Sequence, residues 1–359
     1  SHHFVCFCHC SMPFDYLLVV DFEATADEGQ TPKVARDEAE IIEFPWVLVD
    51  VSTLEAVHWK QVYVKPERTP ITEFCTELTG ITADTVASAG TLSSAVAEID
   101  SFIAEHILSK GKTFCFVADG VWDLSIQLPR ECREKSISLK EYYGRYFDLK
   151  HEYMYVAFGW KSVCVADSVR FLTRKWLRAR HQGDAGPTPE STLNMRTSLA
   201  AMCTTLEIPE EGRLHCGIDD CKKIAQIVIE LLRCKVGDVF VSPIDIHAER
   251  AAFVQAQEQL VFVKGMPFSA TLADITQWFV DHSIGAPEAI HCVIAEFERG
   301  KRPAGAMFVR FATHADALAS LDLNGRVMGA RYLYVRPSNQ AELEQETTVD
   351  MVPDTPLPA

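Results

Sequence analysis

The chain of 359 residues lacks three features that would place it in other classes of protein. It has no uninterrupted apolar run of the roughly 18 residues that a membrane-spanning helix needs, so we expect no membrane association. It has no paired Cys-x-x-Cys framework. It also lacks a basic excess, since 34 Lys and Arg stand against 50 Asp and Glu and the net charge is −16. This balance excludes a protein that coats nucleic acid by charge alone, but not one that holds nucleic acid in a local cleft.

Cysteines are nevertheless frequent, with 12 in the chain. Many lie inside apolar runs, namely Cys115, Cys164, Cys203, Cys234 and Cys292. In a chain far larger than disulfide-dense secreted domains, this distribution predicts free, mostly buried thiols in a reducing compartment such as the cytoplasm or nucleus. A cluster at residues 6–10 is too tightly spaced for the usual pairs of zinc ligands, and its role stays open.

The N-terminus leaves two interpretations open. The chain begins with Ser1, so residues upstream are compatible with the sequence and organellar import stays open. Met12 immediately precedes the first expected strand. If Met12 is the native start, no room remains for a targeting peptide.

The apolar pattern of the first region predicts an α/β domain. Buried strands are expected at residues 17–20 and 113–117, and a hairpin at 41–51 and 57–64 extends the first strand into a sheet. Helices are expected at residues 92–108, 123–132, 167–177, 195–206 and 219–234, with a loop at 182–191. Strands that alternate with helices predict one α/β domain over residues 15–235, after an N-terminal extension at 1–14.

A second pattern follows a linker. Ser242 and Pro243 resemble an N-cap with proline at the first helical position, which predicts a linking helix within residues 236–258. The next elements are a strand (260–264), a helix (271–282), strands (289–297 and 304–311), a helix (313–321) and a strand (331–335). This βαββαβ order predicts an α+β RNA-recognition motif (RRM) over residues 259–338. Residues 339–359 are acidic and contain prolines, which predicts a disordered tail.

Three separated stretches each contribute carboxylates, and the last adds a histidine. They contain Asp21 and Glu23, then Asp123, and finally His215 with Asp219 and Asp220. Residues i and i+2 of a strand point to the same face, so Asp21 and Glu23 project together while Phe22 turns away. Phosphoryl-transfer sites with two divalent cations need such hard oxygen ligands and one base that titrates near neutrality.

Taken singly, each of these residues also has a purely structural interpretation. Asp21 and Glu23 fit a solvated pair at a strand end. Asp123 and the later aspartates fit acids that the dipole favours at a helix N-terminus. His215 fits a capping or core histidine. Their joint order favours the metal site, but the residues alone do not choose between Asp219 and Asp220.

Five blocks of sequence, in order, carry a family resemblance: VVDFEAT, EIIEFPWVLVD, FCTELTGIT, DGVWDLS and HCGIDDCKKIAQI. They resemble the DEDDh group of 3′-to-5′ exonucleases on the ribonuclease H-like fold, and within it the enhanced-RNAi and histone-mRNA exoribonuclease family. The resemblance covers residues from about 15 to 235. It implies a mixed sheet and hydrolysis of RNA to nucleoside 5′-monophosphates. The loop at 182–191 looks longer than the family usually has.

The resemblance also implies residue roles. It assigns Asp21, Glu23, Asp123 and, by the His-x4-Asp spacing, Asp220 to two Mg²⁺ ions, for which Mn²⁺ substitutes. It makes His215 the general base, and a histidine's ordinary pKa of about 6.5 suits that role. The terminal nucleotide is expected to contact Phe22, Ala24, Thr25, Phe74, Leu78, Thr79 and Trp122.

The RRM blocks fall at residues 261–266 and 304–311. Phe262 and Phe308 take the base-stacking positions, while Ala306 replaces the usual third aromatic residue. KGMPFSAT and RPAGAMFVRF resemble the quasi-RRMs of the hnRNP F/H group, which implies that loops contact RNA more than the sheet does. A basic rim for phosphates is expected from Lys264, Arg299, Lys301, Arg302 and Arg310. A protein-docking module of the same fold is the alternative.

Together these patterns predict a Mg²⁺-dependent 3′-to-5′ exoribonuclease that acts on single-stranded RNA or RNA 3′ ends. The rival is an RNA-binding or scaffolding subunit of a ribonucleoprotein complex in which catalysis is incidental. A DNA exonuclease of the same fold is disfavoured by the RRM. The sequence leaves the physiological RNA and the oligomeric state open.

Overall fold

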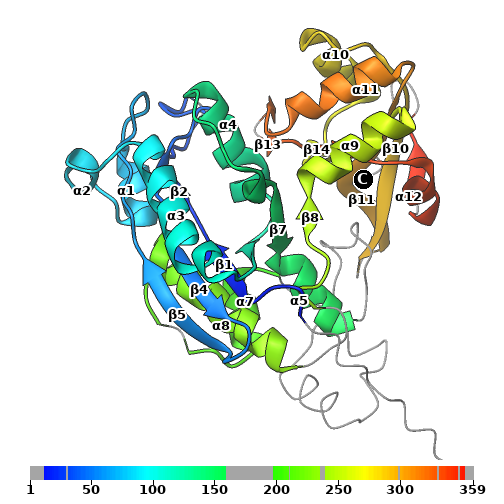
Figure 1. Cartoon of the computed structure of the whole chain (residues 1–359). Coiled ribbons are helices and arrows are strands. Elements are labelled where there is room, and N and C mark those ends of the chain that lie inside the picture. Colours follow the sequence, from blue (N-terminus) through cyan, green and yellow to red (C-terminus); the bar gives the residue numbers. More distant parts are fainter. Residues whose placement is uncertain are drawn as a thin grey trace, which may run out of the picture.

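The structure is a computed structural model that describes residues 12–29, 31–158, 197–209, 211–234, 239–297, 300–329, 331–346 and 348–351. The cysteine cluster at 6–10, the expected helix at 167–177 and the expected loop at 182–191 lie outside the described residues. The two predicted regions are seen as two domains, an α/β domain and an RRM (Figure 1).

The first domain is built on a mixed six-stranded sheet of order β5-β4-β1-β6-β7-β8. Its strands are β1 (Tyr16–Val20), β4 (Trp46–Asp50), β5 (Glu55–Lys60), β6 (Phe114–Ala118), β7 (Arg145–Asp148) and β8 (Ile244–Asp245). β1 pairs antiparallel with β4 and parallel with β6. The expected strand at 41–51 is divided, because β3 (Ile41–Glu43) leaves the main sheet and pairs with β2 (Glu23–Ala24). Pro45, which has no N–H for a strand ladder, lies at the division.

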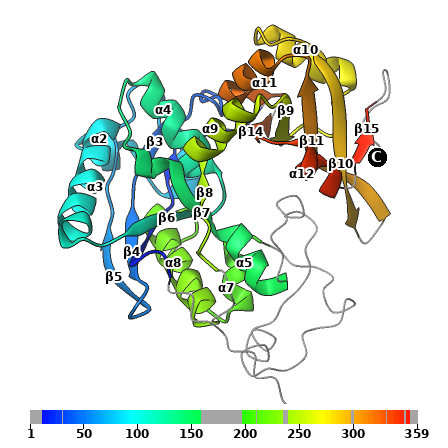
Figure 2. The ribbon, with the colours of Figure 1, turned by 45° about the vertical axis from the view of Figure 1, so that its right-hand side comes forward.

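Helices cover both faces of this sheet (Figure 2). Leu17 and Val19 of β1 belong to one buried core, with α5 (Leu149–Phe158), α7 (Leu199–Thr205) and α8 (Gly217–Arg233). Leu18 and Val20 point into a second core, with α3 (Leu92–His106), η2 (Trp122–Gln127) and α4 (Leu128–Glu134). A strand that is buried on both faces has apolar residues at every position, which is why the first strand was recognisable in the sequence.

Four smaller elements complete the described part of this domain. They are α1 (Glu73–Thr79), α2 (Ala83–Ala87), η1 (Leu108–Lys110) and η3 (Glu141–Gly144). Two of them, α1 and α2, form a separate small apolar cluster with Ile42 of β3. The expected helix at 123–132 is one continuous stretch in space, but its first part, η2, is a π-helix. Wide turns of this kind are frequent at functional sites.

Glu40 organises the loop next to β2 and β3. Its side chain is fully buried. It accepts hydrogen bonds from the backbone amides of Glu67, Arg68 and Thr69 at 3.0, 2.8 and 2.6 Å. The Lys135 ammonium lies 2.8 Å from it. Burial alone would raise the pKa of this carboxyl, but Lys135 and the amides outweigh burial and lower it to about 2.

Substitution Glu40→Gln should therefore destabilise the protein by about 2–3 kcal/mol at neutral pH, because the amide loses the charge-assisted bonds. The folded-state pKa is depressed, so the contribution of Glu40 is present above the ordinary carboxyl pKa near 4.5 and is lost as pH falls toward 2. Urea unfolding at pH 7 and pH 4 should show the gap between the two proteins narrowing at the lower pH. A gap that stays constant would contradict this account of Glu40.

The linker differs from the sequence prediction at its start. The helix α9 (Ile246–Ala256) begins after Asp245, whose carboxylate accepts the Ala248 amide at 2.9 Å as the N-cap. Ser242 and Pro243 instead precede β8, which pairs with β7 and so extends the sheet of the first domain. The N-cap prediction for Ser242 was wrong because this two-residue strand was not recognisable from periodicity.

The second domain has the predicted RRM order of elements. Its sheet runs β14-β9-β11-β10-β15. The strands are β9 (Leu260–Lys264), β10 (Pro287–Phe297), β11 (Gly300–Phe311), β14 (Tyr334–Pro337) and β15 (Thr348–Asp350). The helices α10 (Leu272–Asp281) and α11 (His314–Ser320) pack on one face, and η6 (Leu321–Leu323) follows α11. A small hairpin of β12 (Val327–Met328) and β13 (Arg331–Tyr332) precedes β14.

The prediction of a disordered tail was wrong for its first part. Residues Gln340–Gln345 form α12, which Asn339 caps by accepting the Glu342 amide, and β15 pairs with the edge strand β10. Leu343 of α12 is buried in an apolar cluster with Phe262 and Phe308. The sequence did not predict this helix because Leu343 is its only buried residue and the segment around it is acidic. Residues 352–359 lie outside the described residues.

Two other sequence expectations can be compared with the described residues. The eight cysteines among them are free and mostly buried, as predicted. Among the described helices, none is long and apolar enough to span a bilayer.

Candidate functional site

The predicted acidic residues converge at one edge of the first domain. Asp21 directly follows β1, Glu23 lies in β2, Asp123 in η2 and Asp220 in the first turn of α8. The Glu23, Asp123 and Asp220 side chains are buried. Because β1 and β6 are parallel neighbours, their carboxyl ends meet at this edge and bring together chain segments about a hundred residues apart.

These carboxylates repel one another in a buried setting. Burial, followed by the charges of Asp123 and Glu23, raises the pKa of Asp21 well above its ordinary value. Burial raises the pKa of Glu23 to about 8, and Glu43 and Asp220 add to this effect. Burial, with a contribution from Asp119, raises the pKa of Asp123 to about 7. Buried like charges are costly unless a counterion accompanies them, which makes this edge a candidate cation site.

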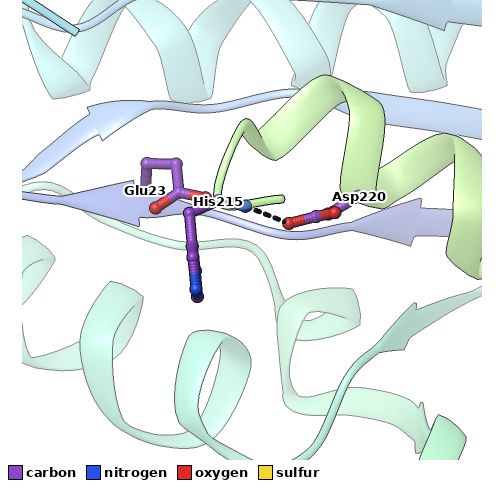
Figure 3. Close-up of side chains that lie close together, drawn as sticks. All are labelled: Glu23, His215 and Asp220. Carbon is purple, nitrogen blue, oxygen red and sulfur yellow. Dashed lines mark hydrogen bonds between the residues drawn. The ribbon is translucent and has the colours of Figure 1, made fainter. Parts of the chain in front are cut away.

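Three side chains of the site could share one ion. Ligand atoms of Glu23, His215 and Asp220 all lie within 4.8 Å of one another (Figure 3). The carboxylate oxygens fit a hard divalent cation such as Mg²⁺. The structure also chooses between the two adjacent aspartates, because Asp220 belongs to this cluster while Asp219 turns aside and accepts the Arg213 amide at 3.0 Å.

His215 is held in an unusual backbone conformation. Its φ of 58° lies in the left-handed region, which costs a non-glycine residue about 1–2 kcal/mol. Its backbone N–H donates to Asp220 Oδ2 at 2.8 Å (Figure 3), and Lys223 Nζ donates to the other oxygen of Asp220 at 2.9 Å. The imidazole itself is exposed. The backbone thus fixes the base candidate beside a cation-ligand candidate while leaving its ring open to solvent and substrate.

Glu43 anchors the helix that carries Asp220, and the sequence analysis gave it no role. Its buried carboxylate accepts the first amides of α8, those of Gly217 and Ile218, each at 3.0 Å. Gln61 Nε2 donates to it at 2.9 Å. Burial raises the pKa of Glu43. The only signal in the sequence was the acid at the end of the EIIE block, which a buried strand rarely tolerates without a partner.

Substitution Glu43→Gln should displace the start of α8. The glutamine side chain places its own N–H group against the backbone N–H groups of Gly217 and Ile218, so one hydrogen bond is lost. This loss should lower the free energy of unfolding by about 1–3 kcal/mol. A shift of about 1 Å at His215 and Asp220 lowers turnover by about 10²-fold. Rate measurements and thermal melts of this variant should be compared with Glu55→Gln, whose side chain is exposed on β5. Unchanged turnover in a destabilised Glu43 variant would mean that the residue serves the fold alone.

Asp119 and Lys150 complete the surroundings of the site and were also not predicted. Asp119 follows β6, and Lys150 Nζ in α5 lies 3.0 Å from its Oδ2. Burial raises the pKa of Asp119, and its charge in turn acts on Asp21 and Asp123. The signal for Asp119 was its place at the end of the strand predicted at 113–117, next to the first strand.

The predicted nucleotide contacts divide into two groups. Phe22 packs against Phe44 with ring centroids 4.3 Å apart, so its side chain belongs to the core. Thr25 is buried, where its hydroxyl bonds to Thr69 and accepts the Glu40 amide. Thr79 is buried and donates to the carbonyl of Cys75. These three side chains act in the fold and are not open to a nucleotide.

The other four candidates remain accessible. Phe74 and Leu78 lie one turn apart on α1 and are partly exposed, as is Ala24 of β2. Trp122, partly exposed in η2, contacts Tyr332 of the RRM with ring centroids 4.0 Å apart. Of the seven predicted contacts, these four keep a side chain that is open to a ligand.

The expected stacking residues of the RRM are covered. Phe262 and Phe308 point away from the helices, as in an RNA-binding sheet, but they are 2% and 0% exposed. Leu343 of α12 lies over them, and the Arg336 guanidinium lies 4.4 Å from the Phe262 ring centroid. In this conformation neither ring can stack on a base. The prediction failed here because the covering helix lies in the segment expected to be disordered.

The two residues of the expected basic rim whose side chains are described, Lys264 and Arg310, lie at opposite ends of the β9–β11 ladder. Lys264 lines a cavity beside the first domain. Arg310 donates to Gln340 of α12 at 2.5 Å. The side chains of Lys301 and Arg302 in β11, and the whole of Arg299, lie outside the described structure.

Comparisons with known proteins find matches for both domains. A family model described as exonuclease matches residues 18–228, and an RRM-domain model matches residues 261–350. Human 3′-5′ exoribonuclease 1 is 31% identical over 222 residues, which cover 61% of this chain and 53% of that protein. The chain spans about half the length of the curated relatives named here.

Two further matches are to a relative that covers most of the chain and to a solved structure. The Schizosaccharomyces pombe RNA-binding protein involved in heterochromatin assembly, dri1, is 26% identical over 345 residues, which cover 93% of this chain and 53% of that protein. Among solved structures, the nuclease domain of 3′hExo, a DEDDh family member bound to rAMP, is 28% identical with a TM-score of 0.48. The match covers 64% of this chain and 96% of that one.

Proposed function

Because the chain belongs to the exonuclease family and carries an RRM behind its exonuclease domain, we propose that it is a Mg²⁺-dependent 3′-to-5′ exoribonuclease. It removes nucleotides from the 3′ end of single-stranded RNA and releases nucleoside 5′-monophosphates. The observation that carries this proposal is the cluster of buried, mutually repelling carboxylates from separated segments, with an exposed histidine beside it.

Each residue of the site has a distinct task. Asp21, Glu23, Asp123 and Asp220 hold the cations. When bound, two divalent cations stabilise charge on the attacking and leaving oxygens of an in-line displacement. His215, fixed through its backbone to Asp220, accepts a proton from the attacking water. Lys223 orients the Asp220 carboxylate, and Glu43 holds the helix end that carries both residues.

One observation favours a second function. The match to dri1 extends through both domains, and that protein is described as RNA-binding. An RNA-binding or scaffolding subunit of a ribonucleoprotein complex is therefore the alternative. It gives no chemical reason for a histidine held strained beside the complete set of buried acids.

The test is the shortening of a 5′-labelled, single-stranded RNA by the purified full chain. We expect a ladder that shortens from the 3′ end in Mg²⁺ and stops on addition of EDTA. An RNA whose 3′ end is blocked serves as the matched control, and a DNA of the same sequence tests the choice of sugar. Tight binding of RNA without Mg²⁺-dependent shortening would favour the scaffold.

On this proposal, the RRM's contribution to RNA binding does not come from base stacking on Phe262 and Phe308, because α12 covers both rings. The surfaces left for RNA are the exposed loops and edges of the domain and the part of the sheet near Lys264 that borders the exonuclease domain. This agrees with the loop mode implied by the resemblance to quasi-RRMs. One such surface is the side of the RRM that faces the exonuclease domain.

A further inference from the structure

A cavity of about 680 Å³ lies between the two domains. Asp119, Trp122 and Lys150 of the exonuclease domain form part of one wall, and Lys264 and Tyr332 of the RRM form part of the other. Figure 1 shows β13 and β14 on the side of the RRM that faces the first domain. A site of this volume is within the range of well-formed ligand pockets.

Polar contacts hold the two walls in register. Asn324 donates from Nδ2 to the carbonyl of Ser125 in η2 at 2.9 Å, and its Oδ1 accepts the Val335 amide at 3.0 Å. Arg250 of α9 lies 3.2 Å from Asp322 of η6. Asn324 thus links η2, the π-helix that contains Asp123, to β14 of the RRM. This link fixes the two walls of the cavity relative to each other.

The cavity lies beside the acidic site, although none of Asp21, Glu23, Asp123, His215 and Asp220 lines it. Trp122 immediately precedes Asp123 in η2. Asp119, which lines the cavity, is close enough for its charge to raise the pKa of Asp21. Its Oδ1 is buried without a hydrogen-bond partner. A strand whose last phosphodiester lies at the acids therefore has the cavity as an adjacent space for the nucleotides that precede it.

The lining has the chemistry of a single-stranded nucleic-acid site. Five basic and four acidic residues line the cavity. The lining is thus more basic than the whole chain, which has 34 Lys and Arg against 50 Asp and Glu. Three of the five basic residues, Lys264, Arg331 and Arg336, come from the RRM. Trp122 and Tyr332 form a continuous aromatic wall, and Tyr332 is 36% exposed. Aromatic faces next to a basic groove bind single strands through base stacking and phosphate contacts.

Resting on the proposed exoribonuclease function, we propose that this inter-domain cavity binds the single-stranded RNA nucleotides immediately upstream of the 3′ terminal one. Trp122 and Tyr332 stack on the bases, and Lys264 and Arg331 contact the phosphates. The cavity is too small for a duplex, so it selects an unpaired 3′ end. The RRM then acts as part of the substrate channel, although α12 covers the face on which such domains usually stack bases.

The test uses the full chain with Asp21→Asn, so that bound RNA is not shortened. Single-stranded 12-nucleotide RNAs carry one photoreactive 4-thiouridine at position 2, 3 or 4 from the 3′ end. We expect crosslinks to the peptides that contain Trp122 and Tyr332. Tyr332→Ala should weaken RNA affinity by about 5- to 100-fold, since one stacking contact is lost. Arg331→Glu should also weaken it and flatten its dependence on salt.

Two matched variants serve as controls. Trp59→Ala removes an aromatic ring that is 57% exposed on β5, the strand at the opposite edge of the sheet from β8. Lys110→Glu reverses an exposed charge on η1. Both should bind RNA like the parent protein. Thermal melts of every variant confirm folding, and the exposure of Tyr332 and Arg331 makes their substitution compatible with it.

Two results would overturn the cavity proposal. One is crosslinking elsewhere together with unchanged RNA affinity in both Tyr332→Ala and Arg331→Glu. The other is affinity that depends on Phe308 and rises when α12 is deleted, which would place RNA on the sheet face. Neither result bears on catalysis, because the proposed function stands or fails on Mg²⁺-dependent shortening by the unsubstituted chain.

Discussion

Asp21→Asn is expected to lower the rate of RNA shortening by at least about 10²–10³-fold, the typical cost of removing one preorganised electrostatic group from an active site. Asp21 lies between Asp123 and Glu23 at the end of β1, where its pKa is raised more by burial than by its charged neighbours. The amide keeps the shape of the side chain but supplies no charge to hold a cation. The rate should be measured with a 5′-labelled single-stranded RNA in Mg²⁺.

Thermal melting distinguishes a loss of activity in Asp21→Asn from a loss of folded protein. In EDTA the variant should melt no lower than the parent, because removing one charge relieves repulsion among the acids. Addition of Mg²⁺ should raise the melting temperature of the parent, since a ligand that binds only the folded state stabilises it, and should raise that of the variant less. Asp84→Asn, at an exposed position of α2, is the matched control. Near-normal activity with a normal Mg²⁺ response would remove Asp21 from the site.

His215→Asn is expected to lower turnover by about 10²–10⁴-fold, the usual contribution of a positioned acid or base. Asparagine is the better replacement here, because the φ of 58° at this position is tolerated by asparagine more readily than by alanine. The backbone bond to Asp220 is therefore kept, and the change is confined to the imidazole. RNA affinity, measured in the absence of divalent cations, should change little.

The Mg²⁺ dependence of the rate distinguishes a base from a ligand. His215 lies close enough to Glu23 and Asp220 for all three to bind one ion. If His215 is a metal ligand, its loss should therefore raise the Mg²⁺ concentration needed for half-maximal rate. A general base instead changes the maximal rate at saturating Mg²⁺. His106→Asn, at an exposed position in the last turn of α3, is the control and should behave like the parent. Loss of RNA affinity in proportion to rate would make His215 a substrate contact.

Local pattern was enough to identify the strands and most helices that carry the site. β1 and β6 are buried on both faces, so each appeared as an uninterrupted apolar run that ended near an acid. A continuous apolar run over residues 260–263 and helical spacing over 271–282 located the first elements of the RRM. These signals are recognisable because a residue's burial on a regular element depends on its position in a short repeat.

Contacts between distant segments were not recoverable in this way. Glu43 reaches the first turn of α8 across more than 170 positions of sequence, and no local period reports such a pairing. The covering of Phe262 and Phe308 was missed for a related reason. Leu343 anchors a helix whose other residues are mostly polar or acidic, and that helix is held by the apolar surface of the sheet together with contacts from Arg336 and Ser338 to Glu342.

The sequence by itself determined the two domain types, the order of their main elements and the set of acids with His215. The order of the elements follows from residue type and short-range spacing, and the roles of the acids and of His215 were implied by the family resemblance. The structure places Asp220 in the cluster and turns Asp219 aside, in line with the His-x4-Asp spacing of the family resemblance. Only the tertiary structure decided that Phe22 packs in the core and that the RRM meets the exonuclease domain at Trp122 and Tyr332. The physical reason is that burial and charge repulsion depend on which distant surfaces meet, and the chain settles that choice only when it is packed.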